Sequence, residues 1–148
     1  MIAIGSDHGG FKLKEEIKKY LDEKEIEYKD FGCESDERTD YPIYAMAVAK
    51  SVQNKECDKG ILICGTGFGM TIVANKFKGI RCASCWNEDV ARFLKEHNDA
   101  NIIALPGRYI NVSEAVAILR AWFGAQFSEG RHSERLKMIE EIENKNMK

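Results

Sequence analysis

Residues 64–70 place a cysteine in front of three alternating glycines, in the order Cys-Gly-Thr-Gly-Phe-Gly-Met. Alternating glycines let the backbone turn tightly and direct successive N–H groups at a single anion. A helix that begins near Gly69 would add partial positive charge at the same point. The segment is not a Walker motif, since no Gly-Lys-Ser or Gly-Lys-Thr follows, and its glycine spacing is one residue short of the dinucleotide fingerprint. It indicates either an anion-binding loop or an ordinary tight turn between a strand and a helix.

Cys64 stands immediately before this loop, and two interpretations of it remain open. A buried cysteine is usually a small, inert hydrophobic residue. A thiol beside a helix N-terminus ionises more readily than free cysteine, and the thiolate can act as a general base. Cys82 and Cys85 have the spacing of a redox or metal-binding pair, but no second pair stands at zinc spacing and the segment has a strand pattern. The sequence indicates no role for the remaining cysteines, Cys33 and Cys57.

Polar side chains stand at the ends of several other apolar or periodic segments. Asp7 and His8 follow the first apolar run, which fits either a site or a turn cap in front of two glycines. His97 ends a predicted helix, where a cationic side chain is also a common stabilising feature. Arg108 follows the last apolar run of this kind. These residue types suit proton transfer and anion binding if the fold brings them together.

Arg131 and Arg135 are four residues apart, so a helix would place them on one stripe with Met138, Ile139 and Ile142. Two arginines suit a phosphate group. Because the arginines continue an apolar face, we expect them to point at something packed against that helix. Ordinary surface salt bridges remain the alternative.

The elements that must position these side chains alternate along the chain. Short apolar runs predict strands over residues 2–6, 26–31, 60–64, 80–85 and 102–105. Apolar residues at helical spacing predict helices over residues 11–23, 41–52, 69–74, 88–97, 114–123 and 134–144. The expected N-caps of three of these helices are Asp40, Asn87 and Ser113.

Strands and helices in strict alternation predict an α/β fold, with one parallel sheet covered by helices on both faces. In such open sheets, ligands bind at the carboxyl ends of the strands, near the switch in strand order. We therefore expect one edge of the sheet to gather Asp7, His8, Cys64, His97 and Arg108.

The composition is that of an ordinary soluble globular protein, with 148 residues, 44% of them hydrophobic, and a net charge of -2. It favours a single domain over residues 1–148 and argues against a nucleic-acid or anionic-membrane partner. No apolar run approaches the roughly 20 residues that span a bilayer, and the start lacks a signal-peptide pattern. Five cysteines without secreted-domain spacing favour reduced thiols and a cytoplasmic location.

Five motifs occur in order over nearly the whole chain: Gly5-Ser6-Asp7-His8-Gly9-Gly10, Asp40-Tyr41-Pro42, the loop 64–70, His97-Asn98-Asp99-Ala100-Asn101 and Gly130-Arg131-His132-Ser133-Glu134-Arg135. Together they resemble the ribose-5-phosphate isomerase B family, which also contains allose-6-phosphate isomerases and the subunits of galactose-6-phosphate isomerase. The resemblance implies a Rossmann-like three-layer αβα sandwich with a five-stranded parallel sheet and a C-terminal helix. It also implies interconversion of ribose 5-phosphate and ribulose 5-phosphate without a metal or organic cofactor, in a homodimer or dimer of dimers whose active sites lie between subunits.

The resemblance also implies roles for individual residues. Cys64 would take the proton next to the sugar carbonyl, Thr66 would move protons between oxygens, and His97 would assist ring opening. The backbone that holds the enediolate would be that of Gly65, Thr66, Gly67, Phe68 and Gly69. Sugar hydroxyls would be bound by Asp7, His8 and Asn98, with His8 also near the phosphate. The phosphate would be bound by Arg108, Arg131 and Arg135, the last two from the partner subunit.

Two positions depart from the family pattern, Gly9 where many members have alanine and Phe68 where many have a smaller aliphatic residue. Phe68 leaves the pocket size open, and with it the choice between five-carbon and six-carbon sugars. Dimer and tetramer also remain open.

A flavin-binding or receiver-type module on the same architecture is the alternative from another functional class. A flavodoxin-like protein would need a hydroxyl-rich phosphate loop after the first strand, where this chain has Asp-His-Gly-Gly. A receiver would need an aspartate at the end of the third strand, where this chain has Cys64. Both departures disfavour this class.

Overall fold

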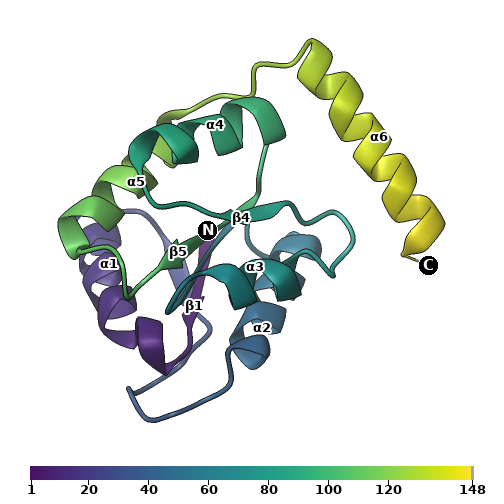
Figure 1. The fold of residues 1–148 in the computed structure, drawn as a ribbon. Coiled ribbons are helices and arrows are strands. Elements are labelled where there is room, and N and C mark those ends of the chain that lie inside the picture. The colour runs from purple at the N-terminus through teal and green to yellow at the C-terminus, as the bar shows by residue number, and fades with distance from the viewer. Residues whose placement is uncertain (148) are drawn as a thin grey trace.

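Strands and helices alternate along the chain as predicted. The computed structural model describes residues 1–147, and Figure 1 shows how its elements are arranged. In chain order they are β1 (Ile2–Ser6), the 3-10 turn η1 (His8–Gly10), α1 (Phe11–Glu23), β2 (Tyr28–Asp30), α2 (Tyr41–Gln53), β3 (Lys59–Cys64), α3 (Phe68–Ala74), β4 (Cys82–Ser84), α4 (Glu88–Asn98), β5 (Ile102–Pro106), α5 (Val112–Gly124) and α6 (Arg131–Asn146).

The five strands form one parallel sheet in the order β2-β1-β3-β5-β4. This confirms the predicted α/β fold. The strands β2 and β4 lie at the two edges and have three residues each, so they are shorter than the predicted ranges 26–31 and 80–85. An edge strand pairs on one side only, and its ends have fewer hydrogen bonds to hold them extended.

The sheet is buried on both faces, and successive residues of each central strand enter different cores. In β3, Ile61 and Ile63 pack with the side chains of α1, α4 and α5, whereas Leu62 and Cys64 pack with those of α2 and α3. This alternation follows from the two-residue period of a strand. The result is a sandwich of three layers, with two helices over one face and three over the other (Figure 1).

The C-terminal helix α6 stands apart from these layers (Figure 1). None of its side chains between Arg131 and Asn146 is buried, and Ile139 and Ile142 are exposed. A hydrogen bond from the Gly79 amide to Glu143 Oε2, 2.6 Å long, ties it to the segment before β4. The helix begins three residues before the predicted position 134, directly after Gly130, whose φ is +61°.

The three predicted N-cap residues agree with the structure only in part. Asn87 caps α4 as predicted, because its side chain accepts a hydrogen bond from the Val90 amide. The prediction of Ser113 as a cap is wrong, since Asn111 caps α5 and forms a capping box with Glu114. Asp40 occupies the cap position of α2, but its side chain makes no capping hydrogen bond.

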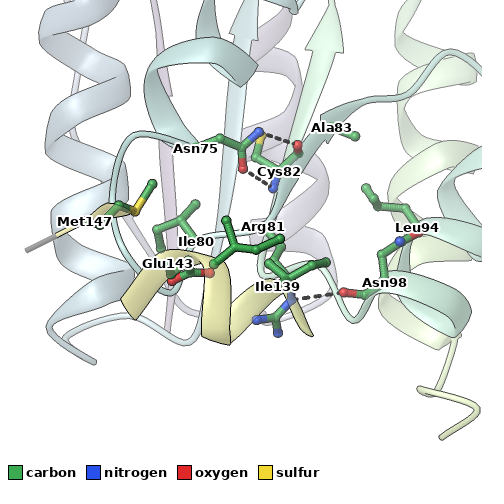
Figure 2. A pocket seen from close by; sticks show the side chains of 11 residues that line it. Asn75, Ile80, Arg81, Cys82, Ala83, Leu94, Asn98, Ile139, Glu143 and Met147 are labelled. Atoms are coloured by element: carbon green, nitrogen blue, oxygen red, sulfur yellow. Dashed lines mark hydrogen bonds between the residues drawn. The ribbon is translucent and has the colours of Figure 1, made fainter. Parts of the chain in front are cut away.

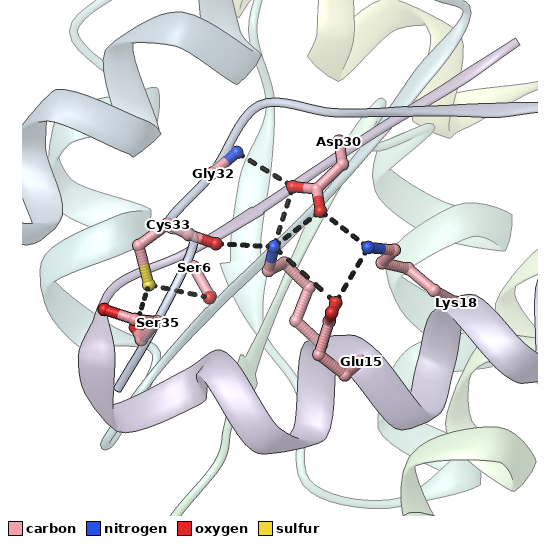
Figure 3. A network of polar contacts seen from close by, with 8 residues as sticks. Ser6, Glu15, Lys18, Asp30, Gly32, Cys33 and Ser35 are labelled. Carbon is pink, nitrogen blue, oxygen red and sulfur yellow. Dashed lines mark hydrogen bonds and ion pairs between the residues drawn. The ribbon is translucent and has the colours of Figure 1, made fainter. Parts of the chain in front are cut away.

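An ion-pair network fixes the segment that follows β2 (Figure 3). The side chain of Lys14 is only 1% exposed, and its Nζ donates to both carboxylate oxygens of Asp30, at 2.8 and 2.6 Å, and to the Cys33 carbonyl at 2.8 Å. Burial acts to raise the pKa of Asp30, but hydrogen bonds from Lys14, Lys18 and the Gly32 amide outweigh it and lower that pKa. The network holds residues 32–33 against the end of β1, next to Asp7.

None of the helices described for residues 1–147 has the length and hydropathy needed to cross a membrane.

Candidate active site

The strand order places a crevice between the carboxyl ends of β1 and β3. The chain leaves β1 toward β2 on one side, and it leaves β3 toward β4 on the other side. Such a switch in direction opens a cleft outside the sheet, and ligands of open α/β folds bind there. Asp7 follows β1 and Cys64 ends β3, so both flank this switch point.

The sulfur of Cys64 is held against the loop that follows it. Cys64 is 5% exposed, and its Sγ accepts a hydrogen bond of 3.2 Å from the backbone amide of Gly67. Gly67 has a φ of +78°, and a Cβ at this position would lie 2.3 Å from Ser84 Oγ. Only glycine fits this turn without strain. The amide that meets the sulfur is therefore fixed in place by the fold.

Two further hydrogen bonds make the loop rigid. The Ser84 hydroxyl donates to the Thr66 carbonyl at 3.0 Å, and the Phe68 amide donates to Thr66 Oγ1 at 3.1 Å. Tyr41 lies over the loop, because a Cβ at Gly69 would come within 2.4 Å of its ring. Ser84 and Tyr41 hold the glycine loop in place, a role that the sequence did not predict for either. Tyr41 nevertheless belongs to one of the motifs quoted above.

Asp7 and His8 form the turn on the other side of the crevice. Asp7 is 8% exposed, and its Oδ1 accepts a 3.2 Å hydrogen bond from the Gly10 amide, so it caps η1. His8 Nδ1 lies 3.2 Å from the Thr39 nitrogen and 3.1 Å from the Thr39 carbonyl oxygen. The neutral ring can accept from that amide, and a ring protonated at Nδ1 can donate to that carbonyl. Either bond directs the far nitrogen of His8 away from Thr39.

Arg108 completes this edge from the end of β5. The Gly107 amide donates to the Cys64 carbonyl at 2.8 Å, and the Arg108 amide donates to the Gly65 carbonyl at 3.1 Å. The Arg108 side chain crosses the loop, because a Cβ at Gly65 would lie 3.1 Å from its Cδ and Nε. The structure therefore brings together Asp7, His8, Cys64, the glycine loop and Arg108.

His97 and Asn98 lie at the opposite edge of the sheet. They end α4, which runs antiparallel to the strands, and they precede the amino end of β5. A strand of five residues spans about 13 Å at roughly 3.3 Å per residue. The prediction that His97 shares an edge with Cys64 is therefore wrong within one chain.

A second group of polar residues gathers around His97. We call it the amino-edge cluster and define it as His97, Asn98, Arg131, His132 and Arg135. The rings of His97 and His132 stack with centroids 4.4 Å apart and planes 9° from parallel. Burial, His97 and the two arginines lower the pKa of His132. Arg131 and Arg135 are exposed on α6, and no side chain within residues 1–147 forms an ion pair with either.

Arg81 holds the end of α4, which carries His97 and Asn98 of this cluster (Figure 2). Its Nε donates to the Asn98 carbonyl at 3.0 Å, and its Nη2 donates to the Asp99 carbonyl at 2.8 Å. Asp99 adopts a left-handed conformation with a φ of +44°, and its carboxylate is paired with Lys95. No sequence pattern predicts this role of Arg81, because an arginine directly before an edge strand is common at any protein surface.

Two hollows lie near these two groups of residues. One, of about 480 Å³, runs between β4 and α6 and includes Arg81, Asn98, Ile139 and Ile142 in its wall (Figure 2). The other, of about 360 Å³, borders the glycine loop and is lined by Thr66, Phe68, Ser84, Trp86, Pro106 and Tyr109. The exposed aromatic rings of Phe68, Trp86 and Tyr109 give this second hollow an apolar wall.

The remaining cysteines, Cys33, Cys57, Cys82 and Cys85, are all buried. Cys82 and Cys85 belong to cores on opposite faces of the sheet, and burial raises the pKa of each to about 12. All five cysteines are free thiols. Within residues 1–147, no group of three or more His, Cys, Asp or Glu side chains is placed to hold a metal ion.

Comparison with known proteins places this arrangement in a family. Residues 2–139 match the family described as Ribose/Galactose Isomerase. Ribose-5-phosphate isomerase B of Escherichia coli (strain K12) is 49% identical over 142 residues, which cover 96% of this chain and 95% of that protein.

Two solved structures have the same fold. Ribose-5-phosphate isomerase B of Clostridium thermocellum superposes with a TM-score of 0.96, at 49% identity and with 97% of each chain covered. The enzyme of Mycoplasma genitalium, solved with bound ribulose-5-phosphate, superposes with a TM-score of 0.93 at 38% identity, over 98% of this chain and 97% of that one. Sequence, topology and the loop around Cys64 thus lead to one conclusion: the chain belongs to the ribose/galactose isomerase family.

Proposed function

We propose that this chain interconverts ribose 5-phosphate and ribulose 5-phosphate, with Cys64 as the general base and an enediolate as the intermediate. The observation that carries the proposal is the hydrogen bond from the Gly67 amide to Cys64 Sγ, at the edge that also holds Asp7, His8 and Arg108. The names of the relatives support the substrate, since ribose-5-phosphate isomerase B of Escherichia coli covers nearly the whole chain.

Proton transfer begins at the carbon next to the carbonyl. The Cys64 thiolate takes the proton from carbon 2 of the open-chain aldose, and the electron pair moves to the carbonyl oxygen on carbon 1. The same thiol then returns a proton to carbon 1, which gives the ketose. The Gly67 amide donates to the sulfur and so holds the base in one position for both proton transfers.

The glycine loop stabilises the negative charge that develops on the sugar oxygens. Its backbone, from Gly65 to Gly69, is held rigid by Ser84 and Tyr41, so its dipoles need little reorganisation during the reaction. Thr66 moves a proton between oxygen 1 and oxygen 2. Fixed dipoles and a base are sufficient for this chemistry, so the proposal includes no metal and no organic cofactor.

A second copy of the chain completes the site. His97 and Asn98 lie on the same side of this copy as Arg131 and Arg135, and away from Cys64. We therefore propose that the whole amino-edge cluster reaches the crevice of a partner subunit, in a homodimer or a dimer of dimers. There His97 opens the sugar ring, and Asn98 joins Asp7 and His8 in binding hydroxyl groups.

The phosphate is bound from both subunits in this arrangement. Arg108 and His8 approach it from the chain that supplies Cys64, and Arg131 and Arg135 approach it from the other. Guanidinium groups bind phosphate oxygens through paired hydrogen bonds, which fix the position as well as the charge. We further propose that residues 1–148 act as one domain, in the cytoplasm, in the pentose phosphate pathway.

A substrate panel tests this proposal. Turnover of ribose 5-phosphate, allose 6-phosphate and galactose 6-phosphate is compared with the purified chain, and ribose 5-phosphate is expected to have the highest kcat/KM. A reaction in deuterium oxide then tests the intermediate, since an enediolate lets solvent deuterium enter at the carbon that receives the proton. Absence of turnover on all three sugars contradicts the proposed function.

A further inference from the structure

His97 lies between two other aromatic rings. Phe93, four residues earlier on α4, stacks on it with centroids 4.8 Å apart and planes at 25°. His132, in the first turn of α6, stacks on it with centroids 4.4 Å apart and planes at 9°. The two contacts come from different helices, and the His97–His132 contact is the closer and more nearly parallel one.

The stack limits the positions that the His97 ring can take. Rotation about its side-chain bonds would move the imidazole out of contact with both neighbouring rings, so the plane of the ring is fixed. The backbone beneath it is fixed as well, because Arg81 donates to the carbonyls of Asn98 and Asp99. A group that transfers a proton must lie within hydrogen-bond reach of the atom it serves, so a fixed ring plane matters for its chemistry.

The charges around His132 favour its neutral form. Arg131 and Arg135 stand on the same helix turn, and two imidazolium rings in parallel contact would repel each other. A neutral His132 can stack on His97 in either protonation state of His97. It therefore restrains the ring without competing for its proton.

We propose that His132 is a positioning residue for His97, and that it acts by stacking and not by contact with the sugar. The proposal rests on the proposed function, in which His97 opens the sugar ring. Ring opening is required for ribose 5-phosphate, which is cyclic in solution. It is not required for ribulose 5-phosphate, whose phosphate blocks the hydroxyl that would close a five-membered ring.

The test compares His132→Ala, His132→Phe and a control, Ser133→Ala, in both directions of the reaction. His132→Ala is expected to lower kcat with ribose 5-phosphate by about tenfold or more, as for other misplaced catalytic groups. Its initial rate with ribulose 5-phosphate should stay near wild type. His132→Phe, which keeps a flat ring against His97, should restore most of the forward rate, and Ser133→Ala should have no effect.

Three outcomes overturn the proposal. They are an unchanged forward rate in His132→Ala, an equal loss in both directions, or a His132→Phe variant as impaired as His132→Ala, which would indicate a polar contact with the substrate. Melting temperature and size-exclusion chromatography establish that each variant is folded and assembled. A wild-type chain without turnover in either direction would instead refute the proposed function itself.

Discussion

The backbone amide of Gly67 donates a hydrogen bond of 3.2 Å to the sulfur of Cys64, three residues before it in the chain. The bond makes the proposed base and the proposed anion-binding loop parts of one turn. Any change in the turn therefore alters both the position of the sulfur and the direction of the loop amides.

The first prediction concerns the base itself. Cys64→Ala should lower kcat by about 10²–10⁴, the range that a general base contributes. The KM should change little, because the residues proposed to bind hydroxyls and phosphate remain. Cys85→Ala removes a buried thiol from the other face of the sheet and is the matched control. Steady-state kinetics on ribose 5-phosphate measure both, and near-normal turnover in Cys64→Ala would remove Cys64 from the mechanism.

The second prediction concerns the turn. Gly67→Ala places a methyl group 2.3 Å from Ser84 Oγ and forces a φ of +78° on a residue with a Cβ. It should lower the free energy of unfolding by about 1–3 kcal/mol and reduce kcat with it. Gly124→Ala is the control, because a Cβ there meets nothing within 4 Å. Denaturant unfolding and kinetics on both variants test this, and equal behaviour of the two would contradict it.

The third prediction concerns the two edges of the sheet. Cys64→Ala and His97→Ala should each be inactive in the forward direction, but subunits mixed after unfolding and refolding should regain activity. Random pairing gives half heterodimers, each with one site free of both changes, so about a quarter of wild-type activity is expected. Refolding each variant alone is the control. If Cys64 and His97 served the same site from one chain, the mixture would stay inactive.

The fourth prediction concerns the ion pair beneath the crevice. The pKa of Asp30 is lowered from its ordinary value of 3.8, so its carboxylate stabilises the fold above about pH 4 and loses this effect as the pH falls further. Asp30→Asn removes the near counter-ion of the buried Lys14 and leaves only the longer 3.9 Å pair with Glu15. The change should cost up to about 3–5 kcal/mol of unfolding free energy at neutral pH. The unfolding free energy of the variant should also fall less on acidification, because this carboxyl group no longer contributes to its pH dependence.

Chemical denaturation at a series of pH values measures both effects of Asp30. Asp36→Asn, in an exposed loop, is the control. Adding Lys14→Met to Asp30→Asn should recover much of the loss, because the buried charge is then absent. Equal stability of Asp30→Asn and wild type at neutral pH would show that the pair contributes nothing.

Much of the fold was predictable because strands and helices differ in hydrophobic period. The continuous apolar run that became β3 and the amphipathic segment that became α1 were found close to their observed bounds. The edge strands β2 and β4 were predicted too long, because the pattern of apolar residues carries no information on how many neighbours a strand has. The sequence predicts Ser113 as the cap of α5, but Asn111 and Glu114 have the spacing of a capping box, and Asn111 is the cap.

The candidate site was predictable at the carboxyl edge and not at the other. Cys64 ends a strand, and Asp7 and Arg108 come shortly after one, so the rule for parallel sheets places all three together. His97 follows a helix and precedes a strand, and the same rule places it at the amino edge. The direction of α6 could not be predicted, since an apolar stripe such as Ile139 and Ile142 does not identify the surface that it covers.

The absence of buried side chains along α6 has a consequence for folding. The sheet and the helices on its two faces form both cores without this segment, so α6 can detach while the rest of the chain stays folded. Its backbone amides should therefore exchange with deuterium much faster than those of β3 or β5 in dilute solution. Protection that rises with protein concentration would show that the helix becomes ordered only when another molecule covers it.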